Sequence, residues 1–351
     1  MIVKDKVGIT SYGVAIPGQV VITEAIEKAQ GKSGMKIGKA LQVISKTVPG
    51  RDEDTITLAT DAALNALANF SGDKLEISNL FIGSESHPYA VKPSGTVVKV
   101  ALGLSEDMAL ADLQFACKAG TQGLQIGFNY LLSGFSKYSL AIGADTAQAK
   151  PGDALEFTAG AGAAAYILGR DNTLVDLKAT VSIVTDTPDF WRRAGQAYPE
   201  HAGRFSGEPA YFYHIITAAK KIMNETGLQA EDFSHCIFHT PNGKFPKLAA
   251  RKLGFKPEQL ESGLVVDRIG NTYAAAVPLA LSAVLDVAKP KEKILVVSYG
   301  SGAGSDAFVF ETTKLIKSYN KDREMKIRDQ IKLLKEVDYQ EYRSVMDLLT
   351  H

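Results

Sequence analysis

The chain has 351 residues, of which 45% are hydrophobic and 22% are charged; this predicts a globular protein of two domains or one large two-part domain. Its 39 basic residues balance its 39 acidic residues, so the composition does not indicate a protein that binds nucleic acid or an anionic membrane. No apolar run approaches the length of a membrane span, and the first residues lack a secretory pattern.

The chain has only two cysteines, Cys117 and Cys236, and they form no Cys-x-x-Cys motif. Neither a disulfide framework nor a metal site is therefore predicted. Sparse cysteine use without a secretory pattern favours a reducing compartment, and we expect a cytoplasmic protein.

Apolar runs typical of strands alternate with segments of helical spacing along the first half of the chain. The predicted strands are 7–14, 80–82, 138–142 and 163–168, and the predicted helices are 54–70 and 95–102. Asp54 is a credible N-cap for the first of these helices. This alternation predicts an α/β fold built in layers.

The second half repeats the same alternation. Its predicted strands are 177–184, 235–238, 294–298 and 307–310, and its predicted helices are 209–226, 246–253 and 273–287. Both halves end on a strand, a glycine-rich turn and a further strand, so an internal duplication is plausible. From Thr312 onward the chain is charged and amphipathic, which favours a surface-docked extension; a partner-binding helix is the alternative.

Cys117 follows the apolar run 110–116 and precedes a helical pattern of apolar residues. A thiol at such a junction lies near the exposed N–H groups and positive dipole end of the helix, which favour the thiolate. This placement suggests a nucleophile. The alternative is that Cys117 is a small buried hydrophobic residue.

Other polar residues stand where a predicted strand or turn ends. Glu85 follows 80–82, His239 follows 235–238, and Asn271 lies in a Gly-Asn turn before a helix of small residues. Polar groups at strand ends build the sites of many sheet enzymes. The glycine loop 299–306 has backbone N–H groups suited to an oxyanion. Each feature alone also fits an ordinary structural role.

Taken together, the strings FACKAG, FHTPNGKF, GNTYAAAVPLAL and YGSGAG resemble the thiolase superfamily of acyl-CoA condensing enzymes over residues 1–312. The motif GSES, which contains Glu85, is similar to that of the 3-hydroxy-3-methylglutaryl-CoA (HMG-CoA) synthases. The segments HAGRFSGEPAYFYH and EVDYQEYR resemble the archaeal members of that family.

The resemblance implies two similar halves in a five-layer α-β-α-β-α sandwich. The expected parts are an N-terminal half at 1–170, a C-terminal half at 171–312 and the extension at 313–351. The first half would carry Glu85 and Cys117. The second half would carry His239, Asn271 and the Ser301 loop.

The resemblance also implies a reaction. Acetyl-CoA would acetylate Cys117, and Glu85 would then remove a proton from the acetyl methyl group. The resulting carbanion equivalent would attack acetoacetyl-CoA, and His239 would protonate the developing alkoxide. Water would release HMG-CoA, a step of the mevalonate pathway to isoprenoid precursors. The CoA thioesters are substrates, and no cofactor is expected.

Further substrate contacts follow from matching positions. They are Thr158, Arg204, Ser206, Lys244, Asn271 and Ser301. Lys244, together with Lys247 or Arg251, would face the phosphates of CoA. Without the resemblance, these three cations would be interpreted as a solvated helix face.

Departures from the superfamily pattern limit the alternatives. Thiolases carry a second cysteine in the last glycine loop, where this chain has Ser301, so a thiolase is disfavoured. A type III β-ketoacyl synthase remains an alternative and is separated mainly by Glu85. A second alternative is a non-catalytic subunit of a complex. The expected partners are a second copy of the chain, an acetoacetyl-CoA thiolase and an OB-fold zinc-ribbon protein that bridges the two enzymes.

Overall fold

The computed structural model describes residues 1–146, 148–203, 206–323 and 325–350. Within them, nine strands form one mixed sheet in the order β11-β12-β13-β8-β1-β7-β6-β4-β5. Their bounds are β1 (Gly8–Ala15), β4 (Ile77–Gly83), β5 (Ala109–Leu113), β6 (Tyr138–Thr146), β7 (Ala161–Gly169), β8 (Val175–Thr187), β11 (His235–Phe238), β12 (Lys293–Val297) and β13 (Gly302–Thr312). Strands β1 and β8 are paired only at their ends, through Gly8–Asp176 and Ile9–Val175. The sheet is therefore two half-sheets joined at one corner.

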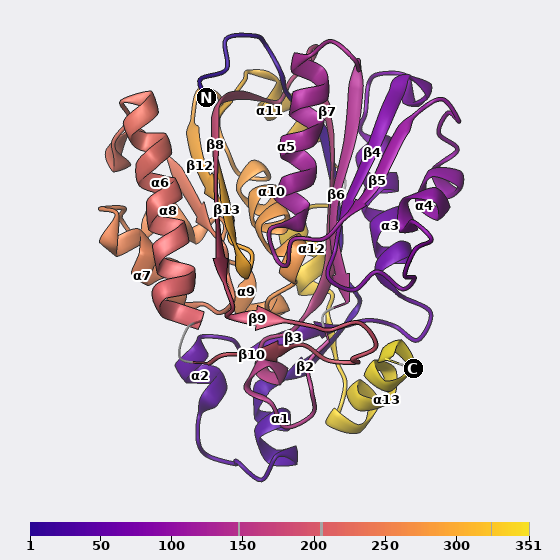
Figure 1. The fold of residues 1–351 in the computed structure, drawn as a ribbon, viewed down its shortest axis with the longest axis vertical. Coiled ribbons are helices and arrows are strands. Elements are labelled where there is room, and N and C mark those ends of the chain that lie inside the picture. The colour runs from indigo at the N-terminus through magenta and orange to yellow at the C-terminus, as the bar shows by residue number, and fades with distance from the viewer. Residues whose placement is uncertain (147, 204–205, 324, 351) are drawn as a thin grey trace.

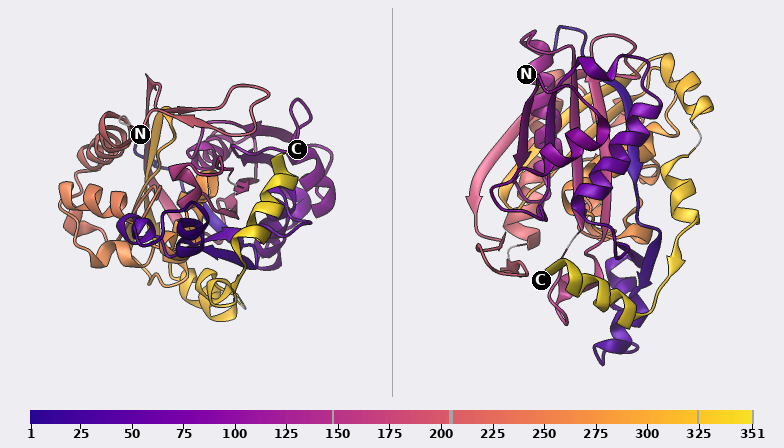
Figure 2. Two further views of the ribbon diagram at one scale, coloured as in Figure 1. Left: turned by 90° about the horizontal axis from the view of Figure 1, so that it is seen from below. Right: turned by 90° about the vertical axis from the view of Figure 1, so that its right-hand side faces the viewer.

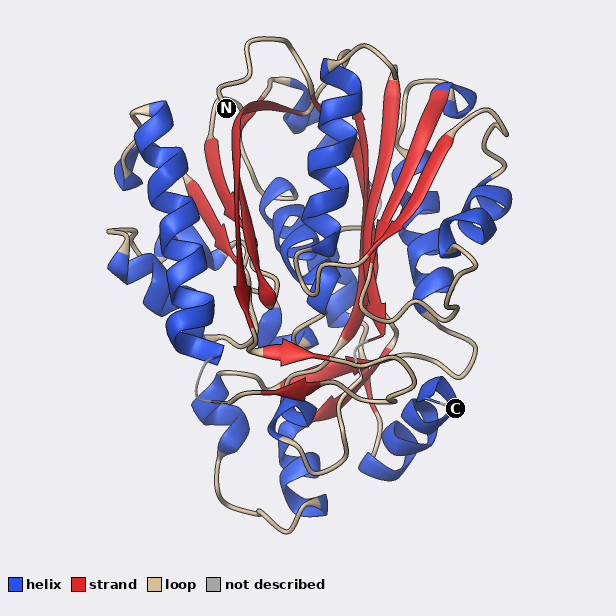
Figure 3. Cartoon of the chain, in the orientation of Figure 1, coloured by secondary structure: helices blue, strands red, loops and turns tan. Residues whose placement is uncertain are grey.

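Helices cover both outer faces of the half-sheets and fill the space between them (Figures 1 and 3). Their bounds are α3 (Thr55–Ala68), α4 (Ser94–Leu102), α5 (Ala119–Leu132), α6 (Phe212–Thr226), α7 (Lys244–Lys252) and α10 (Ala276–Leu285). Helices α3 and α4 cover one half-sheet, α6 and α7 cover the other, and α5 and α10 lie between the two. The predicted five-layer arrangement is confirmed.

The two halves share one topology. In the first, β4 runs parallel to β6, which pairs antiparallel with β7, which pairs antiparallel with β1. In the second, β11, β12, β13 and β8 repeat this order and these directions. Helix α3 follows β1 as α6 follows β8. This repeat supports the internal duplication suggested by the glycine-rich strand ends.

The sequence explains where the central helices lie. Every residue of α10 is buried, as expected of a helix that is apolar all round. Small residues bring the start of α5 close to the turn before α10: a Cβ on Gly120 would lie 2.3 Å from the carbonyl oxygen of Ala274. This close approach brings the Cys117 turn beside the Asn271 turn.

The remaining elements are β2 (Gln19–Ile22), β3 (Ser45–Val48), β9 (Phe190–Trp191), β10 (Glu200–His201), β14 (Lys335–Glu336), α1 (Thr23–Ala29), α2 (Ile37–Leu41), α8 (Glu258–Glu261), α9 (Val266–Ile269), α11 (Leu315–Asp322), α12 (Ile327–Lys332) and α13 (Tyr339–Thr350). Of these, α1, α2, β2, β3, β9, β10 and α13 lie around the lower end of the layers in Figure 1, whereas α11 lies near the upper end. None of the helices in the described ranges has the length and apolar character that crossing a membrane requires.

The C-terminal segment packs against the elements at this lower end of the molecule. Strand β14 pairs with β2, which pairs with β3. Helix α13 buries Tyr342, Val345 and Met346 against α1 and β3, and Figure 2 shows it lying across that end of the molecule. The amphipathic pattern of the sequence thus corresponds to a docked face.

Several element boundaries differ from the prediction, and two of the differences have a clear structural reason. The helix expected at 209–226 begins as an irregular turn, Ser206–Tyr211, and becomes regular only at Phe212. Pro209 lies in this turn, and proline has no N–H to donate within a helix. Strand β5 ends at Leu113, before the end of the apolar run 110–116, because the chain turns there to enter α5.

Candidate active site

Cys117 lies in a tight turn between β5 and α5. Its predecessor Ala116 has a φ of +44°, a left-handed conformation that costs energy for a residue with a Cβ. Backbone N–H groups of Lys118 and Ala119 donate to the carbonyl oxygens of Phe115 and Ala116, each at 3.0 Å. The turn places the thiol, which is 7% exposed, against a cavity rather than inside the core.

This thiol cavity has a volume of about 90 Å³. It brings together predicted residues from distant parts of the chain: Cys117, Ser206, His239, Asn271 and Ser301. Aromatic and apolar side chains complete its walls: Leu155, Phe190, Tyr211, Pro241, Phe245, Tyr273 and Tyr299. The site therefore lies where the N-terminal and C-terminal halves meet.

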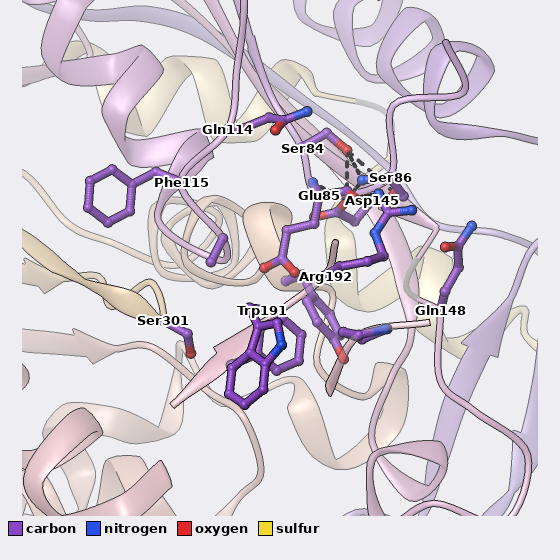
Figure 4. Close-up of a pocket in the computed structure, with 14 residues that line it drawn as sticks. Ser84, Glu85, Ser86, Gln114, Phe115, Asp145, Gln148, Trp191, Arg192 and Ser301 are labelled. Atoms are coloured by element: carbon purple, nitrogen blue, oxygen red, sulfur yellow. Dashed lines mark hydrogen bonds between the residues drawn. The ribbon is translucent and has the colours of Figure 1, made fainter. Parts of the chain in front are cut away.

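Glu85 approaches the same thiol from a second cavity of about 260 Å³. The two cavities share Phe190, Tyr273 and Ser301 as walls. The Glu85 carboxyl group lies beside the Cys117 thiol and interacts with it directly. Figure 4 shows the Glu85 side chain reaching into the cavity from the end of its strand. The carboxyl group thus meets the sulfur where a substrate would bind.

Asp145, at the end of β6, fixes the Glu85 loop. Its Oδ1 accepts hydrogen bonds from the Ser84 hydroxyl (2.7 Å), the Glu85 N–H (2.8 Å) and the Ser86 hydroxyl (2.6 Å), some of which are dashed in Figure 4. Its Oδ2 accepts from the N–H of Ala274 at 2.7 Å. Asp145 therefore ties the Glu85 loop to the turn that carries Asn271. The sequence analysis did not identify it, although an acidic residue closing a buried strand is a usable signal.

Burial determines the protonation of the Glu85–Cys117 pair. It raises the pKa of Glu85 well above the ordinary value, and the nearby Asp145 charge raises it further. Burial also raises the pKa of the Cys117 thiol, with Glu85 adding to the effect. Burial and the neighbouring Glu85 therefore oppose the thiolate that the strand-to-helix junction was expected to favour. The reason is that Cys117 lies before the first residue of α5, next to a carboxyl group that opposes its ionisation.

His239 follows β11, as predicted, and presents a neutral imidazole. Its backbone N–H donates to the carbonyl oxygen of Val297 at 3.0 Å, and its ring packs against those of Tyr211 and Tyr299, with centroids 6.4 and 6.2 Å away. Burial lowers the pKa of His239 to about 3. Its Nδ1 is buried without a hydrogen-bond partner among the described residues, so a ligand in the cavity can supply one.

Asn271 is held by Thr158 and Gly160 of the N-terminal half. Its N–H donates to the Thr158 carbonyl oxygen at 2.6 Å, and its own carbonyl oxygen accepts from the N–H of Gly160 at 2.9 Å. The side-chain oxygen accepts from the N–H of Tyr273 at 3.0 Å. Thr158 lines neither cavity. Its role in the structure is to position Asn271 through a backbone hydrogen bond.

The three predicted phosphate contacts lie apart from this centre. Lys244, Lys247 and Arg251 line a cleft of about 950 Å³ along α7. Phe245, next to Lys244 in the chain, lines the thiol cavity, so the start of α7 borders both. Arg204, also predicted as a contact, lies outside the described residues.

A second acidic residue missed by the sequence analysis supports the glycine loop. Asp189 lines the thiol cavity and accepts hydrogen bonds from the Tyr299 hydroxyl at 2.5 Å and the Gly302 N–H at 2.9 Å. It holds the loop that contains Ser301. No group of three or more His, Cys, Asp or Glu side chains in the described ranges is arranged to bind a metal ion.

Comparisons with known proteins agree with this geometry. Residues 223–312 match the family described as 3-oxoacyl-[acyl-carrier-protein (ACP)] synthase III C terminal. The hydroxymethylglutaryl-CoA synthase of Methanothermobacter thermautotrophicus is 52% identical over 335 residues, covering 95% of this chain and 96% of the relative. That of Archaeoglobus fulgidus is 51% identical over 336 residues, covering 96% and 97%.

Solved structures are similar over nearly the whole chain. MvaS in complex with 3-hydroxy-3-methylglutaryl coenzyme A has a TM-score of 0.89 at 25% identity, covering 98% of this chain and 92% of that one. An HMG-CoA synthase complexed with CoA has a TM-score of 0.87 at 22% identity, covering 97% and 90%, and supports the fold. Members of the hydroxymethylglutaryl-CoA synthase family condense acetyl-CoA with acetoacetyl-CoA, and this chain belongs to that family, within the thiolase superfamily.

Proposed function

We propose that Cys117, Glu85 and His239 divide the HMG-CoA synthase reaction of this chain among themselves. The observation that supports this most directly is the placement of the buried Glu85 carboxyl group beside the Cys117 thiol. A base in contact with the nucleophile lies within reach of a methyl group attached to that nucleophile's acetyl ester.

In the first step the Cys117 sulfur attacks the carbonyl carbon of acetyl-CoA. The thiol proton passes to the departing CoA sulfur, so free CoA and acetyl-Cys117 are formed. Glu85 is not required as the base in this step. The N–H groups of the Cys117 turn and the Ser301 loop are suited to stabilise the tetrahedral oxyanion.

In the second step the Glu85 carboxylate removes a proton from the acetyl methyl group. The new carbon nucleophile attacks the C3 ketone of acetoacetyl-CoA, whose oxygen accepts a hydrogen bond from His239. The proton that Glu85 took from the methyl group reaches the resulting alkoxide by way of His239, which returns to its neutral form. A neutral imidazole suits this role because it can donate a hydrogen bond to the ketone before bond formation. Water then cleaves the Cys117 thioester, which gives HMG-CoA and restores the thiol.

The proposed substrate contacts occupy two regions. Ser206, Asn271 and Ser301 would surround the reacting groups in the thiol cavity, while Thr158 would act by holding Asn271. Lys244, Lys247 and Arg251 would face the phosphates of CoA, which the clustering of these cations along one cleft supports. Arg204 is retained as a proposed contact on the resemblance alone.

The proposed partners extend beyond the substrates. Strand β5 is the last strand of the sheet and pairs only with β4 among the described strands, so a second copy could continue the sheet across this edge. The acetoacetyl-CoA thiolase and the OB-fold zinc-ribbon protein are proposed on the resemblance. Recovery of the native protein as a homodimer alone would count against that complex. The two free cysteines suit the proposed cytoplasmic location.

The proposal is tested by incubating the protein with acetyl-CoA and analysing the Cys117 peptide by mass spectrometry, before and after addition of acetoacetyl-CoA. We expect an acetyl adduct on Cys117 that disappears as HMG-CoA is released. An unmodified Cys117 peptide, or condensation only with a carrier-protein thioester, would contradict the proposal.

A further inference from the structure

A buried ion pair lies directly beside the nucleophile. The Nζ of Lys118 lies 3.0 Å from Oδ2 of Asp306, and the two side chains are 1% and 0% exposed. Lys118 follows Cys117 in the chain and caps the start of α5, whereas Asp306 belongs to β13. The pair therefore joins the two halves of the molecule at the active site.

Both charges have further partners. The Lys118 ammonium group donates to Oε1 of Gln122 and lies 4.3 Å from the centre of the Phe115 ring. Asp306 accepts hydrogen bonds from the Thr121 hydroxyl at 3.0 Å and the Ser182 hydroxyl at 2.6 Å. The ion pair is thus fully hydrogen-bonded, as a buried pair must be to offset its desolvation.

Stability alone does not explain such a pair, because replacing a buried ion pair by neutral groups is often neutral or stabilising. Its position is more informative. Gly300 packs so closely on the Cys117 turn that a Cβ there would lie 2.4 Å from the Phe115 carbonyl oxygen and 2.6 Å from Cβ of Lys118. The Lys118 side chain therefore lies between the turn that carries Cys117 and the loop that carries Ser301.

We propose that Lys118 and Asp306 are positioning residues for acetyl transfer. They hold the strained Cys117 turn at a fixed distance from the Ser301 loop, and so set the separation of the N–H groups that receive the carbonyl oxygen of the thioester. This inference rests on the proposed role of Cys117. It predicts that loss of the pair slows acetylation without weakening the binding of acetyl-CoA.

The test compares Lys118→Met, Asp306→Asn and the double variant Lys118→Met/Asp306→Asn. Single variants leave one buried charge unpaired and should lower the thermal midpoint, whereas the double variant should recover most of it. In all three we expect acetylation of Cys117 at saturating acetyl-CoA to slow by about 10- to 100-fold, as small displacements of reacting groups do. The KM for acetyl-CoA should stay within about twofold of the wild-type value.

Two controls separate positioning from general damage. Alkylation of Cys117 by iodoacetamide needs the thiol but no oxyanion pocket, so its rate should match that of the wild type. Arg323→Met breaks a second strongly buried ion pair, Arg323–Asp286 at 2.6 Å. Arg323 lines neither cavity. This substitution should lower stability yet leave the acetylation rate of the folded protein unchanged.

The outcomes are distinguishable. Slow acetylation with normal alkylation in the refolded double variant supports positioning by the ion pair. A double variant that is acetylated at the wild-type rate, or that loses acetylation and alkylation together, overturns it. Failure of the wild-type protein to form acetyl-Cys117 would instead overturn the proposed function itself.

Discussion

At the scale of single residues, the site depends on groups whose charged forms are disfavoured by burial. Glu85 and Cys117 lie side by side and both have raised pKa values, while His239 has a lowered pKa and a neutral ring. Burial therefore disfavours a thiolate–imidazolium pair in the resting site. In the proposed mechanism, the position of Glu85 beside the sulfur lets it reach the acetyl group that replaces the thiol proton.

The lowered pKa of His239 predicts a pH dependence of stability. The folded protein binds this proton with a pKa of about 3, against 6.5 for an unperturbed histidine. Between these values the unfolded state binds more protons, so the contribution of His239 to stability is complete above pH 6.5. It is lost as the pH falls toward 3, at up to about 1.4 kcal/mol per pH unit.

The variant His239→Gln cannot titrate and should lose this term. Urea unfolding of both proteins between pH 4.5 and 7.5 measures it: the free energy of unfolding of the variant should fall less steeply below pH 6.5. Equal slopes for the two proteins would show that His239 is not held neutral in the folded state.

At the scale of elements, the active site depends on how closely α5 approaches the turn before α10. Gly120 permits that approach, because its Cα faces the carbonyl oxygen of Ala274. The same turn presents Asn271 and Tyr273, and Asp145 bonds to it from β6. The same close contact therefore packs α5 against the turn before α10 and positions Asn271, Tyr273 and Asp145.

Two alanine variants on the same helix test this packing. In Gly120→Ala the new Cβ would lie 2.3 Å from the carbonyl oxygen of Ala274. We therefore expect a loss of about 1–3 kcal/mol in the free energy of unfolding and slower acetylation of Cys117. In Gly123→Ala the nearest atoms would lie at 3.6 Å. That variant should gain up to about 1 kcal/mol from helix propensity and keep its activity; equal effects of the two changes would contradict the account.

The limits of prediction also lie at the element scale. Strands and helices could be predicted from the sequence because their apolar periodicity is local. Glu85, Cys117 and His239 each follow such an element, but their roles were predicted from the resemblance to the thiolase superfamily. The kink at Pro209 and the early end of β5 depend on how the chain turns in three dimensions. Asp145, Asp189 and Asp306 were not predicted as site residues because their hydrogen-bond partners are distant in sequence. The role of each carboxylate is visible only when the two halves are packed together.

At the scale of the whole molecule, a duplicated topology places its two halves face to face and builds the site at their junction. The N-terminal half contributes Glu85 and Cys117, and the C-terminal half contributes His239 and Asn271. The C-terminal segment then packs under both, where Lys46 of β3 donates a hydrogen bond to the Tyr342 hydroxyl at 2.8 Å. The extension therefore contributes to the core at the end of the molecule that carries β2 and β3.

This integration predicts that the extension stabilises the fold. Tyr342→Ala removes a side chain that is 1% exposed and leaves the buried Lys46 without this acceptor, so the free energy of unfolding should fall by about 3–5 kcal/mol. Leu348→Ala on the same helix removes a side chain that is 59% exposed and should cost no more than about 0.5 kcal/mol. Chemical denaturation measures both, and a Tyr342→Ala protein as stable as the Leu348→Ala protein would show that α13 is only loosely attached.

The most direct test of the central claim separates the two chemical steps assigned to the Cys117–Glu85 pair. In Glu85→Ala and the isosteric Glu85→Gln, acetylation of Cys117 by acetyl-CoA should survive, whereas release of HMG-CoA after addition of acetoacetyl-CoA should fall by about 10²- to 10⁴-fold because the base is gone. The exposed Glu106→Ala serves as the matched control and should behave as the wild type. Mass analysis of the Cys117 peptide, together with assay of HMG-CoA, gives both rates. Accumulation of acetyl-Cys117 without product is the predicted result; equal loss of both steps, or undiminished condensation, would contradict the assignment of Glu85 as the base.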